Sequence, residues 1–333
     1  MRATPFIVGI LVGLLSLPMV ALADEPSGPE STHDHHHDDH HDHGHHHDDG
    51  HDHASTDDDS GLAHDLASSN IETRYKETLE TPPVVAWSLT AELGFLAVVS
   101  HIVQLSNDGT RFDYRSQGGQ DVLFPFFRLS TDLKFKGRHI ISFLYQPLKL
   151  TGETVLSEDV VFDDVTFPAG TPLNSVYGFP FWRIGYMYDF LRRKGDEVAL
   201  GFGLQIRNAT ITFTSADGTL RADRRDIGPV PLIEFRGRWG FENGVWWGTE
   251  IDGIYAPISV INGSDNEVTG ALVDASVRAG FATPVGADVF LNLRYLAGGA
   301  VGDSEPESIG SDGFTRNWLH FLTVSLGATL HVL

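Results

Sequence analysis

Hydrophobic and polar residues alternate with a period of two along most of the chain that follows residue 84. Between Val198 and Arg207, large apolar residues occupy every even position, and glycine, alanine, glutamine or arginine occupies every odd position. Residues 271–281 and 127–135 repeat this alternation. Successive side chains of a β-strand point to opposite faces, so the pattern predicts strands that each carry one apolar face.

The polar face of these expected strands distinguishes a soluble β-sandwich from a membrane barrel. Its charged residues lie in mid-strand with nearly balanced signs, which is typical of side chains that pair inside a narrow lumen. The basic residues are Arg128, Lys134, Arg183, Arg207, Arg236, Arg238, Arg278 and Arg294, and the acidic residues are Glu92, Asp132, Glu234, Glu250, Asp252 and Asp274. The other face carries an aromatic girdle formed by Trp182, Tyr186, Tyr188, Trp239, Trp247, Tyr255, Tyr295 and Trp318. We therefore predict an all-β fold, an antiparallel transmembrane β-barrel.

The spacing of turn signals predicts the number of strands. Tight connections are expected at 136–138, 193–196, 242–244 and 284–287. Between them lie mostly longer ones, near 105–120, 153–175, 261–267 and 300–316, and one short one at 215–218. Short periplasmic turns that alternate with longer outer loops are typical of outer-membrane barrels. We predict ten strands with both ends of the barrel in the periplasm, or twelve strands if residues 154–167 add a further hairpin to the wall.

The first 84 residues differ in character from the rest of the chain. Arg2, the apolar run Phe6–Val20 and the small-residue pattern Ala21–Ala23 together predict a secretory signal peptide that is cleaved after residue 23. Residues 24–84 are polar and offer nothing that would bury a core, which predicts a disordered periplasmic arm. The expected organisation is a signal peptide at 1–23, the arm at 24–84 and the barrel at 85–333.

Composition and charge exclude several classes of protein. The chain has 333 residues, of which 41% are hydrophobic, so it is not disordered throughout. Its formal net charge of -22 is concentrated between Asp24 and Asp65, a stretch without Lys or Arg. Such an acidic chain repels phosphate, so no nucleic-acid partner is expected. The absence of cysteine excludes disulfides, thiolate catalysis, cysteine-ligated zinc and iron–sulfur clusters.

A tract at residues 33–53 is built from histidine, aspartate and two glycines only. Imidazole is a ligand suited to Zn²⁺, Ni²⁺, Cu²⁺ and Co²⁺, and carboxylates offset the charge of the ion. The tract therefore predicts metal binding, with Zn²⁺ as the expected ion, although the chain requires no cofactor. The predicted metal ligands are His33, His35, His36, His37, His40, His41, His43, His45, His46, His47, His51 and His53. The alternatives are a solvated acidic spacer and an arm that responds to pH.

Four short stretches of the sequence carry a resemblance to known proteins, namely Tyr145–Thr151, Thr166–Pro172, Ile251–Pro257 and Trp318–His320. With them the chain resembles, over roughly residues 85–333, an uncharacterised family of bacterial outer-membrane β-barrel proteins. The resemblance implies the barrel and the outer membrane, and it brings no activity and no functional residues. Barrels of this kind usually end in an aromatic residue that the barrel assembly machinery reads, whereas this chain ends in Leu330–Leu333.

Other residues suggest weaker functional hypotheses. By strand parity, His101 and His320 are expected to face outward near the outer rim, where they would adjoin. His139 and His331 are expected near the periplasmic end. The outer-loop acids at 158–164 would either bind divalent cations that bridge lipopolysaccharide or form a hydrated acidic loop. No Gly-x-Ser-x-Gly or His-Glu-x-x-His motif is present, so no catalytic residue is predicted.

The leading hypothesis is an outer-membrane barrel whose periplasmic arm captures or buffers zinc, nickel or copper. The first alternative is a structural or narrow-channel barrel with an incidental histidine-rich spacer, and the second is a hydrolase built from surface loops. The expected partners are outer-membrane lipid and lipopolysaccharide, the barrel assembly machinery and divalent metal ions.

Overall fold

The computed structural model describes residues 84–191, 195–257, 268–303 and 313–332. Residues 1–83, with the expected signal peptide and the tract at 33–53, lie outside this part. The described residues form strands, and no helix among them is long and apolar enough to cross a membrane. The strands are β1 (Val85–Leu105), β2 (Phe112–Asp113), β3 (Leu123–Phe135), β4 (His139–Gln146), β5 (Lys149–Val155), β6 (Val160–Phe162), β7 (Val165–Phe167), β8 (Pro172–Gly178), β9 (Phe181–Asp189), β10 (Glu197–Ser215), β11 (Arg221–Gly240), β12 (Val245–Pro257), β13 (Thr269–Ala282), β14 (Ala287–Asp303) and β15 (Phe314–His331).

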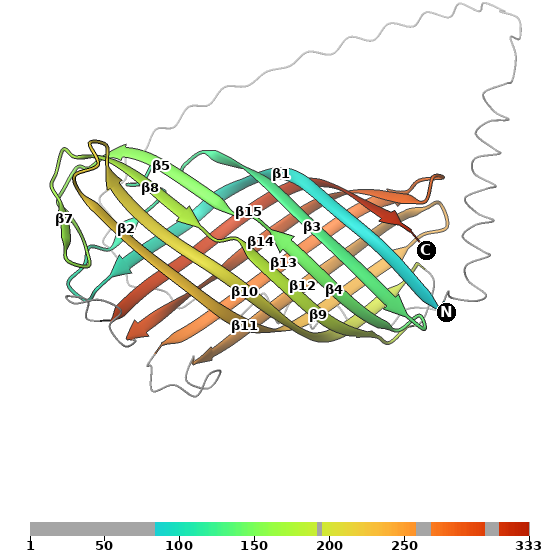
Figure 1. Ribbon diagram of the computed structural model, residues 1–333. Coiled ribbons are helices and arrows are strands. Elements are labelled where there is room, and N and C mark those ends of the chain that lie inside the picture. Colours follow the sequence, from blue (N-terminus) through green and yellow to red (C-terminus); the bar gives the residue numbers. More distant parts are fainter. Residues whose placement is uncertain (1–83, 192–194, 258–267, 304–312, 333) are drawn as a thin grey trace, which may run out of the picture. The chain divides into compact units, whose positions relative to one another are not determined.

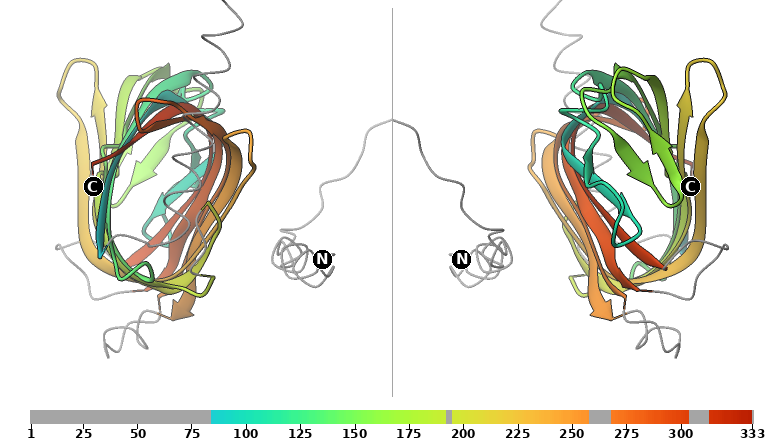
Figure 2. Two further views of the ribbon diagram at one scale, coloured as in Figure 1. Left: turned by 90° about the vertical axis from the view of Figure 1, so that its right-hand side faces the viewer. Right: turned by 90° about the vertical axis from the view of Figure 1, so that its left-hand side faces the viewer.

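Ten of these strands close into an antiparallel barrel. The wall runs in the order β11, β12, β13, β14, β15, β1, β3, β4, β9 and β10, and β10 pairs with β11 to complete the ring (Figure 1). The end-on views of Figure 2 show this ring. The prediction of ten strands is confirmed. Residues 160–167 do form a hairpin, but β6 and β7 pair only with each other in a separate sheet, so the count of twelve is wrong.

The two faces of the wall follow the predicted alternation. On β10, Leu200, Phe202 and Leu204 are exposed on the outer face, whereas Ala199 and Gln205 are buried on the lumen side. The strands pack closely enough that a Cβ added at Gly201 would lie 1.9 Å from the carbonyl oxygen of Tyr186 on β9. Small residues on the lumen face thus permit a narrow barrel with bulky side chains elsewhere in the lumen.

A β-bulge in β1 changes which residues face the lumen. The register with β15 shifts between Val98 and Ser100, so Val99 is an extra residue without a partner. Strand parity beyond the bulge is reversed, and His101 points into the lumen, where it is fully buried. The expectation that His101 faces outward is therefore wrong. His320 does face outward, and the two histidines lie on opposite faces of neighbouring strands.

The chain enters and leaves the barrel at the rim that carries the short turns. The turn residue Lys136 donates its backbone N–H to the Val84 carbonyl, and Val332 donates to the Trp87 carbonyl. The opposite end carries the longer connections, including the segment between β1 and β3 and the segment between β5 and β8. The prediction that both ends of the barrel share the short-turn end is confirmed.

Candidate functional site: the barrel lumen

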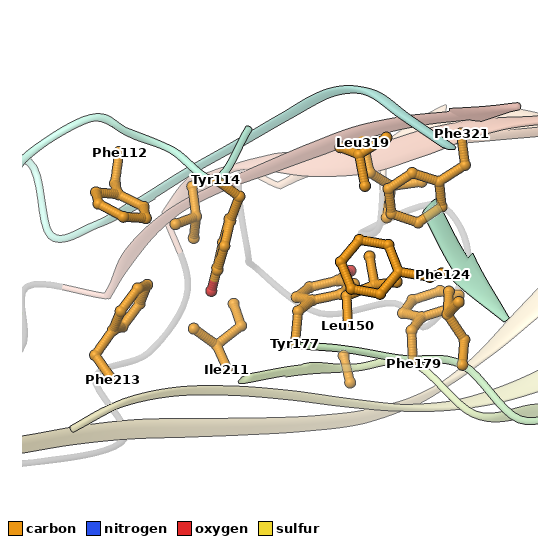
Figure 3. Close-up of a cluster of buried hydrophobic side chains, with 14 of the residues drawn as sticks. Phe112, Tyr114, Phe124, Leu150, Tyr177, Phe179, Ile211, Phe213, Leu319 and Phe321 are labelled. Carbon is orange, nitrogen blue, oxygen red and sulfur yellow. The ribbon is translucent and has the colours of Figure 1, made fainter. Parts of the chain in front are cut away.

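The outer half of the lumen is filled by hydrophobic side chains. Residues 106–122, which we call the plug segment, connect β1 to β3 and place Phe112 and Tyr114 in full burial. Their rings contact Phe213 of β10, with centroid distances of 5.3 Å from Phe112 and 5.5 Å from Tyr114. Phe162 of the outer hairpin stacks on Phe213 at 3.7 Å. Figure 3 shows these aromatic residues, except Phe162, gathered with aliphatic residues from several strands.

The plug segment is attached to the wall through His101. The imidazole stacks on Tyr114 with centroids 4.3 Å apart, and its Nδ1 lies 3.2 Å from Oε1 of Gln120. The backbone N–H of Tyr114 donates to the His101 carbonyl, and that of Gln120 donates to the Tyr114 carbonyl. Burial raises the pKa of the Tyr114 hydroxyl well above its usual value, because the phenolate would lose its hydration. The bulge in β1 is therefore what places a ring where the plug segment can pack on it.

The sequence did not predict this apolar plug. The connection near 105–120 was expected to be an outer loop, and the lumen of transmembrane barrels is usually polar. The available signal was the pair Phe112 and Tyr114, whose large aromatic side chains are unusual at alternate positions of a solvated loop.

A layer of ion pairs crosses the middle of the lumen. Arg183 of β9 bonds to Asp252 of β12, and its Nη2 lies 3.0 Å from Oδ2 of Asp274. Arg294 of β14 also bonds to Asp274, and its Nη1 donates to Oε1 of Gln146 at 2.5 Å. Apart from Asp252, whose side chain is 11% exposed, these charged side chains are no more than 3% exposed. Each charge is desolvated and compensated by a partner. Arg294 and Asp274 lie on neighbouring strands, whereas the bonds of Arg183 to the two aspartates and of Arg294 to Gln146 join strands that are not adjacent in the wall.

A second group of ion pairs surrounds Glu92 of β1. Its Oε1 lies 3.2 Å from Nη2 of Arg278 and 3.9 Å from Nη1 of Arg128. Its Oε2 accepts from Asn292 at 2.7 Å and from Ser325 at 2.8 Å. This fully buried carboxylate thus has partners on four strands, which satisfies the requirement that a buried charge be paired and hydrogen-bonded.

The short-turn end of the lumen holds a cavity of about 200 Å³. Lys134 reaches Asp189 at 2.7 Å and Glu197 at 2.9 Å, and Arg236 reaches Glu197 at 2.6 Å. Arg238 contacts Asp288 at 2.7 Å. The cavity is therefore lined by charges of both signs that already have partners.

Three lumen acids were absent from the sequence prediction, namely Asp189, Glu197 and Asp288. Each lies at a strand end, yet each is an even number of residues from a recognised lumen residue on its own strand, as Asp288 is from Arg294. Strand parity would have found them. Among the described residues, all fourteen predicted lumen charges except Glu234 form ion pairs, and ten of them pair with one another as predicted. The other three, Lys134, Arg207 and Arg238, pair with acids outside the predicted set.

The histidines of the barrel do not come together. Nδ1 of His139 lies 2.8 Å from the Tyr186 hydroxyl on the outer face, and Nδ1 of His320 lies 2.6 Å from the Tyr295 hydroxyl. His331 lies on the lumen side, 3.1 Å from Asp288. Within the described ranges, no group of three or more His, Asp or Glu side chains could hold a metal ion. The twelve predicted metal ligands between His33 and His53 lie outside those ranges.

The acids of the outer connection have local partners. Glu158 accepts from Gln117 of the plug segment at 3.0 Å, and Asp159 accepts from the Ala169 backbone at 2.7 Å. Asp163 lies 3.7 Å from Arg224 of β11. These carboxylates therefore fasten the outer hairpin to the plug segment and to the wall.

No protein-family model and no curated protein matches the chain. Among solved structures, the barrel is similar to the attachment invasion locus protein Ail of Yersinia pestis, with 9% identity, a TM-score of 0.31, and coverage of 73% of this chain and 99% of that chain. It is also similar to the outer membrane protease OmpT of Escherichia coli, with 11% identity, a TM-score of 0.37, and coverage of 77% and 99%. The toluene transporter TodX of Pseudomonas putida has 9% identity, a TM-score of 0.27, and coverage of 79% and 92%.

These similarities are distant, and the closed wall itself establishes the class of protein. Its outer face is apolar at mid-strand, most of its lumen charges are paired, and every one of its ten strands pairs with a neighbour on both sides, so that the sheet closes into a ring. The chain is an outer-membrane β-barrel, the fold that the sequence resemblance implied.

Proposed function

We propose that the protein is an outer-membrane anchor for a periplasmic arm that captures zinc. The observation that carries this proposal is the tract at 33–53, in which 12 of 21 residues are histidine and seven are aspartate. A flexible chain of this composition can close several neutral imidazoles around one ion, while the carboxylates offset the charge of that ion. Neither a solvated spacer nor a membrane anchor requires such a density of imidazoles.

The position of the barrel's first strand supports a periplasmic arm. β1 begins at Val85 beside the short turns, and in outer-membrane barrels the short turns face the periplasm. Residues 54–84 would link the tract to β1. On the sequence-based expectation of a disordered arm, this linker would have a root-mean-square span of about 30 Å. The tract would therefore sample the periplasm near the membrane surface while remaining attached to it.

The closed lumen supports the role of an anchor. Ion pairs fill the middle of the barrel, and hydrophobic side chains fill much of its outer half. The proposed activity consequently belongs to the arm, and the barrel serves to hold the arm at the membrane.

The test is growth of cells that carry the intact protein or a variant in which the twelve tract histidines are replaced by glutamine. Both strains are grown from zinc chelation to zinc excess. The glutamine variant keeps the length and the acidic charge of the arm and removes the imidazoles. We expect it to fail at one end of the series, and the failing end distinguishes supply from protection.

The matched control replaces the seven aspartates of the tract by asparagine and keeps every histidine. We expect this control to retain most of the growth advantage, because imidazoles supply most of the ligands. Equal growth of the native and glutamine strains at every zinc concentration would overturn the proposal, provided that both proteins are present in the outer membrane in equal amounts.

A further inference from the structure

Among the described residues, the barrel wall has a gap between β11 and β12. The ladder between β10 and β11 extends from the pair Glu197–Arg238 to the pair Thr214–Arg221. Followed from the same short-turn end, the ladder between β11 and β12 extends only as far as the pair Ile233–Gly253. Residues 221–232 of β11 therefore have no strand on their second edge within the described part of the chain, as can be followed in Figure 1.

Two prolines explain where this ladder ends. Pro229 and Pro231 have no N–H, and residues at alternate positions of a strand present their backbone groups to the same edge. Pairing with β10 continues through both prolines, so the missing donors belong to the edge that faces β12. A strand on that edge would lose two successive hydrogen bonds, which disfavours closure of the wall there.

The gap opens at the level of the lipid-facing surface. Ile233 and Pro229 pair with Phe202 and Ile206 of β10, whose side chains are exposed on the outer face. Exposed apolar residues at mid-strand mark the band that contacts acyl chains. The gap consequently extends from that band toward the outer rim of the barrel.

A cavity of about 370 Å³ lies behind the gap. This volume falls in the range of about 300 to 1,000 Å³ that is typical of small-molecule sites. Its lining includes Ile227 of β11, Ile254 of β12, and the buried residues Tyr177, Phe179 and Leu319. The last three are labelled in Figure 3. Glycines contribute to the lining, namely Gly228, Gly270, Gly298 and Gly299. A Cβ added at Gly228 would meet no atom within 4 Å, so the absence of a side chain there leaves open space.

Gln205 and Arg207 are among the lining residues that carry a donor without a hydrogen-bond partner among the described residues. Gln205 is fully buried, and its Oε1 accepts from Arg183 at 2.7 Å, so its Nε2 is the donor that remains without an acceptor. Arg207 donates from Nη2 to Asp226 at 2.8 Å, while its buried Nε has no acceptor. A buried donor without an acceptor is costly, and the missing groups are acceptors at Gln205 and Arg207. The lining also holds Oδ1 of Asn317, an acceptor without a donor among the described residues.

We propose that the gap between β11 and β12 admits a single-chain amphiphile from the outer leaflet into this cavity. The hydrocarbon chain lies against Phe179 and Leu319, and acceptor oxygens at its polar end bind Gln205 and Arg207. A fatty-acid carboxylate is the simplest molecule with this chemistry. The site is independent of the arm, so this proposal and the zinc proposal stand or fall separately.

The test is binding of tritiated dodecanoate to the full chain in lipid nanodiscs, with empty nanodiscs as background. We expect one saturable site per protein. Gly228→Leu is expected to abolish this site, because a Cβ at Gly228 meets no atom within 4 Å and the larger side chain occupies the cavity without displacing the backbone. Ala275→Leu is the matched control, since it adds the same side chain on the lipid-facing side of β13.

A second variant tests the polar end of the site. Arg207→Lys keeps the positive charge beside Asp226 and removes the Nε donor, so we expect dodecanoate to bind on the order of tenfold more weakly. Absence of saturable binding to the native protein, or unchanged binding to Gly228→Leu, would overturn the proposal. So would equal losses in Gly228→Leu and Ala275→Leu. Deletion of residues 33–53 is expected to leave dodecanoate binding unchanged.

Discussion

Tyr114 shows how a single side chain controls the stability of the plug segment. Its ring packs against His101 and Phe213, but its buried hydroxyl has no hydrogen-bond partner among the described residues. Removal of the hydroxyl therefore costs nothing in lost hydrogen bonds and relieves a desolvated polar group, whereas removal of the ring would leave a cavity.

We predict that Tyr114→Phe raises the free energy of unfolding by about 1 kcal/mol at neutral pH. The advantage of the variant should grow above about pH 10. There Tyr114 of the native protein ionises in the unfolded chain but stays protonated in the folded barrel, because burial raises its pKa. This ionisation stabilises the unfolded chain of the native protein, and a phenylalanine cannot ionise. Urea titration in detergent micelles, followed by the heat-modifiable shift of the folded barrel on gels, measures both effects. Tyr255→Phe, at a residue 77% exposed, is the control and should change neither. A lower stability for Tyr114→Phe would contradict the prediction.

Sequence parity located the lumen charges because the period of two is a local property of the strand. Arg183 and Asp274 were placed correctly on the lumen face from their neighbours alone. The partner of each charge was not predictable, because Arg183 and Asp274 are 91 residues apart in the chain and meet only when the barrel closes. Asp189 and Glu197 were missed because they lie at strand ends, where the alternation gives way to turns.

At the scale of one element, the bulge in β1 determines which residues of that strand face the lumen. Val99 is the extra residue, and the strand on either side of it pairs regularly with β15. The bulge reverses parity, which places His101 inside the barrel rather than on its surface. A parity argument that assumes a regular strand is therefore correct only as far as the first bulge.

We predict that deletion of Val99 is tolerated. Val98 would then precede Ser100 in a regular strand, and His101 would remain opposite Leu319 on the lumen face. Deletion of Leu326 from the regular strand β15 is the matched comparison. It should prevent folding, because a shift by one residue exchanges the lumen and lipid faces of part of the strand. Heat-modifiability of the two refolded deletion variants distinguishes the outcomes, and equal behaviour of the two would show that the bulge does not set the register.

At the scale of the whole molecule, two successive layers of side chains fill much of the lumen. Hydrophobic side chains around Tyr114 and Phe213 fill much of the outer half, and the ion pairs around Arg183 and Asp274 fill the middle. Ten strands enclose an interior that side chains of ordinary size can fill. The ion-pair layer would remain if the plug segment were absent.

We predict that the refolded protein gives no steady conductance in planar bilayers. Replacement of residues 107–121 by a short glycine–serine linker should also give none, because the ion pairs around Arg183 still cross the lumen. A porin reconstituted by the same procedure is the positive control. Steady, ion-selective current steps from the native protein would contradict this prediction and would favour the narrow-channel hypothesis over that of an anchor.

The sequence by itself determined the class of fold and the charged lumen, and it favoured ten strands over twelve. These follow from the alternation, from the spacing of turns such as Lys136–Arg138, and from mid-strand charges such as Arg294, all of which are local in the chain. The composition of residues 33–53 likewise predicted metal chemistry without any fold. The tertiary structure decided the rest. The apolar plug, the inward position of His101 and the early end of the β11–β12 ladder depend on contacts between segments that become neighbours only when the sheet closes.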